Sequence, residues 1–130
     1  MLTRNTLGKQ YKLNSPASRE QLEEAEKQIA IPTQYKNFLT ISNGLYTGEM
    51  LVLLGAEDLY TRNHNYEVQK CIPGYTMIGD DSGGIAILMD EEGRIYENDM
   101  GVMNHEFMQT SAASLEDLLI NLKGKTISER

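Results

Sequence analysis

The sequence predicts an α+β domain, with two N-terminal helices, an antiparallel and mostly meander β-sheet, and a C-terminal helix packed on that sheet. Three observations favour this fold class. Helical patterns lie towards both ends of the chain, strand patterns lie together between them, and strands do not alternate with helices. Segregated elements of this kind are typical of α+β domains, whereas alternating strands and helices produce parallel sheets.

The first predicted helix begins after Ser18. Ser18 and Gln21 have the three-residue spacing of a capping box, in which each side chain bonds to the other residue's backbone. Leu22, Ala25 and Ile29 then form an apolar stripe at helical spacing. These features together predict an amphipathic helix of about three turns.

A second helix is predicted from Pro32, because proline suits the first position of a helix. Tyr35, Phe38 and Leu39 would share one of its faces. The helix is expected to end at Asn43-Gly44, where Gly44 can adopt the left-handed conformation of a C-terminal cap.

The middle of the chain carries the strand patterns. The apolar run 50–54 predicts a strand covered on both faces, residues 57–60 a single helical turn, and residues 61–67 a surface loop. Glycine-containing turns separate three further segments and predict a meander of antiparallel strands. These segments are residues 75–79, 85–89 and 94–98. A four-residue turn at 90–93 would place Met89 opposite Arg94.

The last predicted helix begins near Ser114, which can cap it. Its apolar stripe consists of Leu115, Leu118, Leu119 and Leu122, and Gly124 is expected to end it. We expect one domain over residues 1–130, with a core from about 18 to 122 and flexible ends at 1–14 and 125–130.

The net charge of −7 is concentrated in one part of the chain. Residues 76–100 contain seven acidic residues and a single basic one, Arg94, whereas the charges of residues 1–75 sum to zero. An acidic surface repels nucleic acid and anionic lipid and attracts basic partners. Cys71 is the only cysteine, no apolar run is long enough to span a membrane, and no secretory signal is recognisable. We therefore expect a cytoplasmic protein that contacts neither nucleic acid nor membrane.

Residues 81–84, Asp-Ser-Gly-Gly, resemble the tail of a trypsin-like nucleophile signature. Asp80 stands where that signature has its first glycine, and a nucleophilic serine also needs an oriented base. His64 and His105 are the only histidines, and both lie in polar segments. We interpret residues 81–84 as a tight turn and predict no catalytic residue.

The acidic residues of the hairpin divide into two groups in the predicted register. Asp80, Asp81, Glu97 and Asp99 would gather at one end of the strands, and Asp90, Glu91 and Glu92 at the other. Carboxylates can hold Ca²⁺ or Mg²⁺, but the spacing matches no calcium-binding loop. We expect a solvated acidic rim without metal or other cofactor, and a hydrolase dependent on a divalent metal remains an alternative.

A protein-binding surface is the third interpretation of this acidic segment. Arg94 is its only local cation, so the carboxylates cannot all be neutralised within the segment, and their mutual repulsion is unfavourable. Binding of a basic partner would explain such an arrangement. The predicted partner contacts are Asp80, Asp81, Glu97 and Asp99, with Glu91 and Glu92 as a second, peripheral group.

The segment from about 18 to 122 also resembles the SUKH superfamily (the Smi/Knr-like domains). The matching motifs are an acidic first helix, a Pro-x-x-Tyr-x-x-Phe-Leu segment ending in Asn-Gly, and an Ile-Gly strand followed by Gly-Gly and an Asp…Gly turn. They correspond here to Glu26, Ile31-Pro32, Tyr35, Phe38-Leu39, Asn43-Gly44, Ile78-Gly79, Gly83-Gly84, Asp90, Gly93, Ile95-Tyr96 and Asp99. Ile31 replaces the usual leucine, Leu45 stands where a glycine is frequent, and the chain has no tryptophan.

This resemblance implies a bacterial immunity protein, which is not an enzyme and acts in the cytosol. Such a protein binds and blocks the toxic domain of a cognate polymorphic toxin. Many of these toxins are nucleases, whose basic active surfaces an acidic hairpin can occupy in place of the phosphate backbone. Fungal relatives act as regulatory scaffolds, so a scaffold that binds a cellular protein remains an alternative. The sequence leaves the oligomeric state open.

Overall fold

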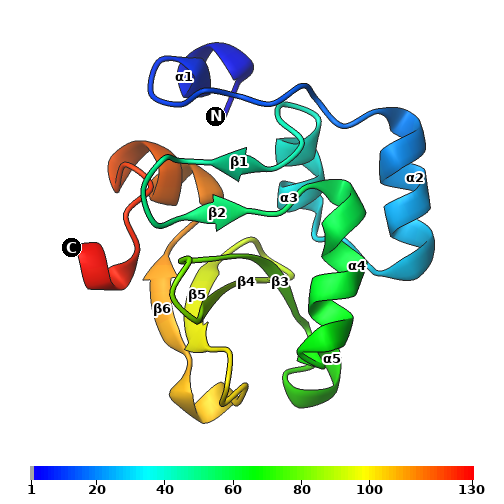
Figure 1. The fold of residues 1–130 in the computed structure, drawn as a ribbon, viewed down its shortest axis with the longest axis vertical. Coiled ribbons are helices and arrows are strands. Elements are labelled where there is room, and N and C mark those ends of the chain that lie inside the picture. The colour runs from blue at the N-terminus through cyan, green and yellow to red at the C-terminus, as the bar shows by residue number, and fades with distance from the viewer. Residues whose placement is uncertain (1) are drawn as a thin grey trace.

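A six-stranded antiparallel sheet forms the centre of the computed structural model, which describes residues 2–130. The strand order β1-β2-β3-β4-β5-β6 is an uninterrupted meander (Figure 1). The strands are β1 (Leu45–Tyr46), β2 (Val52–Leu53), β3 (Tyr75–Asp80), β4 (Ile85–Asp90), β5 (Ile95–Asp99) and β6 (Gln109–Ala112). The predicted α+β fold class is therefore confirmed.

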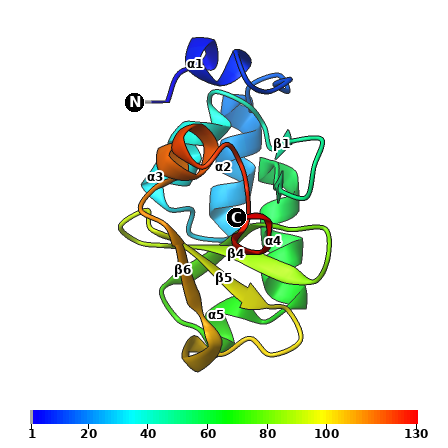
Figure 2. The same cartoon turned by 90° about the vertical axis from the view of Figure 1, so that its left-hand side faces the viewer.

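Most helices lie on one side of this sheet, and α5 lies on the other side (Figure 2). They are α1 (Arg4–Gly8), α2 (Arg19–Gln28), α3 (Thr33–Leu39), α4 (Ala56–Asn65), α5 (Val68–Cys71), the 3-10 helices η1 (His105–Phe107) and η3 (Ile127–Glu129), and the π-helical turn η2 (Asp117–Asn121).

The sheet separates two hydrophobic clusters. The larger cluster joins the apolar sides of α1, α2, α3, α4 and η2 to one face of the sheet, represented by Ile87, Met89 and Ile95. The smaller cluster packs Val68 and Ile72 against Leu88 on the other face. Alternation of side chains along each strand produces this division. It also decides on which side each acidic residue of the hairpin lies.

The first two predicted helices are confirmed with small differences at their ends. Ser18 and Gln21 form both bonds of the capping box, at 3.1 and 2.8 Å. Pro32 is the N-cap of α3 rather than its first helical residue. The helix ends at Leu39, so Asn43 and Gly44 belong to the connection that leads into β1.

The prediction of one helical turn and a surface loop over 57–67 is wrong, because α4 runs from Ala56 to Asn65. Its N-terminus is capped from a distance: Oδ1 of Asn43 accepts a hydrogen bond from the Ala56 nitrogen at 2.7 Å. The amide of Asn43 also donates to Glu57 at 3.0 Å. Sequence patterns recognise a capping residue only when it directly precedes the helix. They therefore missed this cap, which another segment of the chain supplies.

The predicted register of the β4–β5 hairpin is wrong by one residue. Met89 lies opposite Ile95 rather than Arg94, which brings Ile87 opposite Glu97. The turn has three residues between Asp90 and Arg94, and Gly93 adopts a positive φ of 90°. Such a turn has a left-handed last position, which glycine occupies without strain.

The C-terminal helix is confirmed, although the residues 117–121 have π-helical geometry. Oγ of Ser114 accepts a hydrogen bond from the Asp117 nitrogen at 3.0 Å, as a cap should. Both ends of the chain, which we expected to be flexible, contribute to the folded core. Leu7 and Thr126 are fully buried, while Met1 lies outside the described residues.

Tyr11 ties the N-terminal segment to the C-terminal helix, and its titration provides a test of this contact. Its hydroxyl donates a 2.6 Å hydrogen bond to the Leu119 carbonyl. Burial, and secondarily the charge of Glu49, raises the pKa of Tyr11 from 10.0 to about 12. As the pH rises, the unfolded chain loses this proton first, so the stabilisation is full below pH 10.0 and is lost as the pH approaches about 12.

We therefore expect the Tyr11→Phe variant to lose less stability than the parent protein across this pH interval. Urea unfolding at several pH values measures the difference in slope. Tyr46→Phe, at an exposed tyrosine, is the matched control and should keep the parent's slope. Equal slopes for the parent and Tyr11→Phe would contradict the assignment.

Candidate functional site

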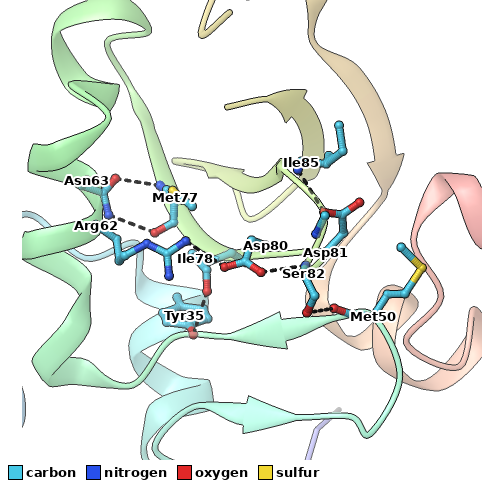
Figure 3. Close-up of polar contacts among 11 residues, drawn as sticks. Tyr35, Met50, Arg62, Asn63, Met77, Ile78, Asp80, Asp81, Ser82 and Ile85 are labelled. Carbon is cyan, nitrogen blue, oxygen red and sulfur yellow. Dashed lines mark hydrogen bonds and ion pairs between the residues drawn. The ribbon is translucent and has the colours of Figure 1, made fainter. Parts of the chain in front are cut away.

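Asp80 ends strand β3 and points towards helix α4. Its Oδ2 lies 2.8 Å from Nη2 of Arg62, and its Oδ1 accepts a hydrogen bond from the Ser82 nitrogen at 2.8 Å (Figure 3). Because Asp80 pairs with Ala86, it shares the face of the smaller hydrophobic cluster. Its charge is thus compensated by a cation from another part of the fold.

Asp81 organises the turn between β3 and β4. Only 4% of its surface is exposed, and its Oδ1 accepts hydrogen bonds from the nitrogens of Gly83 and Ile85 at 2.8 and 2.9 Å (Figure 3). A carboxylate that accepts two backbone bonds inside a turn stabilises that turn. The geometry therefore assigns Asp81 a structural role.

Ser82, at the centre of the protease-like motif, is held in the left-handed conformation with φ 65°. Its Oγ donates a 2.8 Å hydrogen bond to the Met50 carbonyl (Figure 3). Both histidines contact tyrosine rings instead: His64 stacks on Tyr60, and His105 lies edge-on to Tyr75. Within residues 2–130, neither histidine therefore contacts Ser82 as a base, in agreement with the interpretation of a tight turn.

Glu97 and Asp99 lie on the other face of the sheet from Asp80. Only 5% of Glu97 is exposed, and its Oε2 accepts bonds from Oγ of Ser111 at 2.7 Å and from the Ile127 nitrogen at 2.9 Å. Asp99 is exposed, and its Oδ1 accepts a 2.7 Å bond from the Gly101 nitrogen.

The expectation that four carboxylates share one exposed face is therefore wrong. Asp81 and Glu97 are buried, and Asp80 is paired on the opposite side of the sheet. Two facts were hidden from sequence reasoning: the register of the β4–β5 pair and the partners supplied by α4 and the C-terminal segment. Asp99 is the member of the group that presents its charge to solvent.

Glu91 and Glu92 lie in the turn at the opposite end of the hairpin, as expected, and both are exposed. Glu92 forms a 2.7 Å ion pair with Nη2 of Arg94. A hydrogen bond with Tyr96, followed by the charges of Glu92 and Asp90, raises the pKa of Arg94. Glu91 has the least compensated charge of this turn.

The metal interpretation receives no support from the geometry. Among residues 2–130, no group of three or more His, Cys, Asp or Glu side chains is arranged to hold a metal ion. Asp80, Asp81 and Asp99 are directed to different partners, namely Arg62, the turn amides and Gly101.

A cavity of about 270 Å³ lies where β4, β5 and β6 end. Four of its lining residues lie on the same face of the sheet, because Asp99 pairs with Ile85 and Glu97 pairs with Gln109. Ile127 and Ser128 of the C-terminal segment line one side of it, and the Ile127 nitrogen bonds to Glu97. We call it the Glu97 cavity, lined by Ile85, Glu97, Asp99, Phe107, Gln109 and Ile127 among others.

Two large apolar side chains are exposed in the connection between β5 and β6, and one of them, Phe107, lines this cavity. Val102 is 50% exposed and Phe107 57% exposed, and the Val102 nitrogen donates to the Asp99 carbonyl at 3.2 Å. Sequence reasoning missed Phe107 and Ile127, because neither stands in a recognisable motif. Phe107 could have been recognised in the sequence as an aromatic residue within a polar loop.

A second acidic groove, of about 480 Å³, runs between α2 and α4. Glu20, Glu24 and Glu57 line it. Glu20 and Glu24 belong to the predicted acidic helix, whereas Glu57 was predicted to lie in a single helical turn. Asn43 donates to Glu57 at 3.0 Å, and Lys27 lies 3.6 Å from Glu24, so this groove is partly neutralised.

Most residues of the recognisable motifs hold the fold together. The hydroxyl of buried Tyr35 donates to the carbonyl oxygens of Leu54 and Ile78, which joins α3 to the sheet (Figure 3). A side chain on Gly93 would collide with Gln34, whose amide donates to the Glu92 carbonyl at 3.1 Å. The motifs therefore identify a fold more directly than a binding site.

Comparison with known proteins agrees with this conclusion. The model of the SMI1/KNR4 family (SUKH-1) matches residues 16–121, which is most of the chain. A search of curated proteins found no match. Within residues 2–130, none of the helices has the length and apolar character needed to cross a membrane.

Proposed function

Because this chain belongs to the SMI1/KNR4 family (SUKH-1), we propose that it is a non-enzymatic, cytoplasmic immunity protein. It binds a cognate polymorphic toxin and blocks the toxin's active surface. The acidic charge of the chain favours a nuclease as that toxin. Family membership is the observation that carries this proposal. The net charge of −7 supports a basic partner, since opposite charges speed encounter and align the two surfaces.

The proposed docking face consists of Asp99, Val102, Phe107 and the Glu97 cavity. An exposed aromatic residue beside a pocket and a charged rim is the usual arrangement of an energetically important contact. Phe107 supplies the apolar anchor, and Asp99 faces the basic surface of the toxin. Glu91 and Glu92 at the far turn are peripheral contacts that guide approach. Asp80 and Asp81 support the adjacent β3–β4 turn.

Co-expression with a toxin tests the proposed function directly. The proposal predicts that a gene next to that of this chain encodes a large protein with a basic C-terminal domain, and that domain is the toxin to use. We expect the chain to co-purify with that domain and to restore growth of cells that express it. Capture of a cellular protein without toxic activity would instead favour the regulatory scaffold. Growth that is not restored despite stable expression of both proteins would refute the immunity role.

Replacing Asp99 with lysine should slow association with the captured partner about tenfold at low ionic strength, because a local repulsion replaces an attraction. The difference should shrink in high salt, where exposed charges are screened. Stopped-flow or surface-based kinetics at several salt concentrations measure it. Glu23→Lys, on the exposed side of α2, changes the net charge equally and is the matched control. If both variants slow association to the same extent, total charge rather than the docking face controls encounter.

A further inference from the structure

Glu97 is a buried carboxylate without a cationic partner. Its two hydrogen bonds, from Ser111 and Ile127, both end on Oε2. Within residues 2–130, no ion pair involves Glu97 and no hydrogen bond is formed to Oε1, which does not belong to the fully enclosed unsatisfied atoms and is therefore reached by solvent, although only 5% of the residue is exposed. Burial of a charge is strongly unfavourable unless the charge is paired. The carboxylate of Glu97 is therefore held by two neutral donors on Oε2, while Oε1 faces solvent without a protein partner.

The guanidinium of Arg130, which shares Ser111 with Glu97, bonds to Ser111 and not to Glu97. Nη2 of Arg130 donates to Oγ of Ser111 at 2.9 Å, and Nη1 donates to the Ser111 carbonyl at 2.7 Å. The Ser111 hydroxyl in turn donates to Glu97 Oε2 at 2.7 Å. Arg130 thus polarises the hydroxyl that bonds Oε2, and Oε1 remains available.

The free oxygen belongs to a residue that lines a cavity of about 270 Å³. Cross-strand pairing places Glu97, Asp99 and Ile85 on the same face, so the cavity has a buried carboxylate inside and an exposed one at its edge. Ile85, Phe107 and Ile127 supply apolar walls. An elongated group with methylene carbons and a cationic end matches this arrangement, since it can pack its stem on the walls and donate to both carboxylates.

We propose that the Glu97 cavity receives a lysine or arginine side chain of the partner protein. The nitrogen of that side chain donates to Oε1 of Glu97 and to the carboxylate of Asp99, and its stem packs against Phe107. The proposal rests on the proposed function, because it names the chemistry by which the docking face recognises a basic toxin. In this proposal Glu97 binds the partner from inside a cavity, whereas the sequence indicated that it would be an exposed surface contact.

The test uses defined probes and the whole chain, so it does not depend on knowing the toxin. Nα-acetyl-lysine methylamide and Nα-acetyl-arginine methylamide are titrated into ¹⁵N-labelled protein, with the uncharged norleucine analogue as a reference. We expect saturable shifts of the Asp99, Phe107 and Ile127 amide signals with at least one cationic probe, and none that saturate with norleucine. Absence of saturable shifts with both cationic probes, or equal binding of norleucine, would overturn the proposal.

Variants separate the role of the charge from that of the fold. Glu97→Gln keeps an oxygen for Ser111 and Ile127 but removes the charge, and it should weaken binding of the cationic probe tenfold or more. Glu23→Gln, on the exposed side of α2 and outside the docking face, is the matched control and should bind as the parent does. Phe107→Ala changes an exposed side chain and should weaken binding about threefold without unfolding the protein. Unchanged probe affinity in Glu97→Gln would refute the role of Glu97.

The same variants distinguish failure of this inference from failure of the proposed function. If the cationic probes bind in the cavity but no toxin is neutralised, the cavity assignment stands and the immunity role falls. If a toxin is neutralised and its dissociation rate is the same with Glu97→Gln and the parent, the immunity role stands and the cavity assignment falls.

Discussion

The Gly79→Ala variant is expected to lose about 3 kcal/mol or more of folding stability, a large fraction of what a domain of this size has. A Cβ atom at Gly79 would lie 2.1 Å from the carbonyl oxygen of Val52. Because that oxygen belongs to the backbone of β2, which pairs with β3, no side-chain rotation can relieve the collision. The two strands would have to separate. The free energy of unfolding in urea measures the effect.

Gly83→Ala is the matched control for this prediction. It lies in the same part of the recognisable motif, but its added Cβ would be 3.5 Å from the nearest atom, which is ordinary contact. We expect a change within about 0.5 kcal/mol. If Gly79→Ala unfolds at the same urea concentration as Gly83→Ala, the close approach of β2 and β3 does not decide the stability of the sheet.

The Asn63→Leu variant is expected to lose about 3 kcal/mol, because a buried hydrogen-bond network would be left incomplete. Asn63 is fully buried on α4, and its side chain accepts from the Met77 nitrogen at 2.8 Å and donates to the Met77 carbonyl at 2.9 Å (Figure 3). It also accepts from the amide of Gln69 at 2.9 Å. These bonds satisfy both backbone groups of Met77 next to the β-bulge of β3. Leucine has the same branching pattern as asparagine but bonds to neither group.

Asn65→Leu makes the same substitution at an exposed position of the same helix and should change stability by less than about 0.5 kcal/mol. Thermal and urea unfolding of both variants provide the comparison. Equal stability of the two variants would show that water or a local rearrangement satisfies Met77 without Asn63.

Gly79 and Asn63 illustrate two kinds of predictability. Gly79 belongs to a motif that was recognised in the sequence. A glycine is required there because the backbone of the neighbouring strand approaches closely. Asn63 lay in a segment interpreted as a surface loop, because an asparagine in a polar stretch has no local signal of burial. Its role depends on a strand that follows it by 14 residues along the chain.

The candidate site shows the same division. The acidic segment was found correctly as a concentration of charge, but composition does not say where each charge points. Asp80 is paired by Arg62 from α4, and Glu97 is enclosed by the C-terminal segment that we expected to be flexible. Asp99, Glu91 and Glu92 remain exposed. The surface that emerges combines one of the predicted carboxylates with Phe107, which no pattern had indicated.

The sequence by itself determined the class of fold, the capped first helix, the meander of strands and the family, because each depends on residues close together along the chain. Capping boxes, apolar periodicity and glycine turns are local interactions and can be read locally. The tertiary structure alone decided which carboxylates are paired, buried or exposed, and where the cavity lies. Those outcomes depend on contacts between distant segments and on the strand register, because a difference of one turn residue changes which side chains of two paired strands share a face.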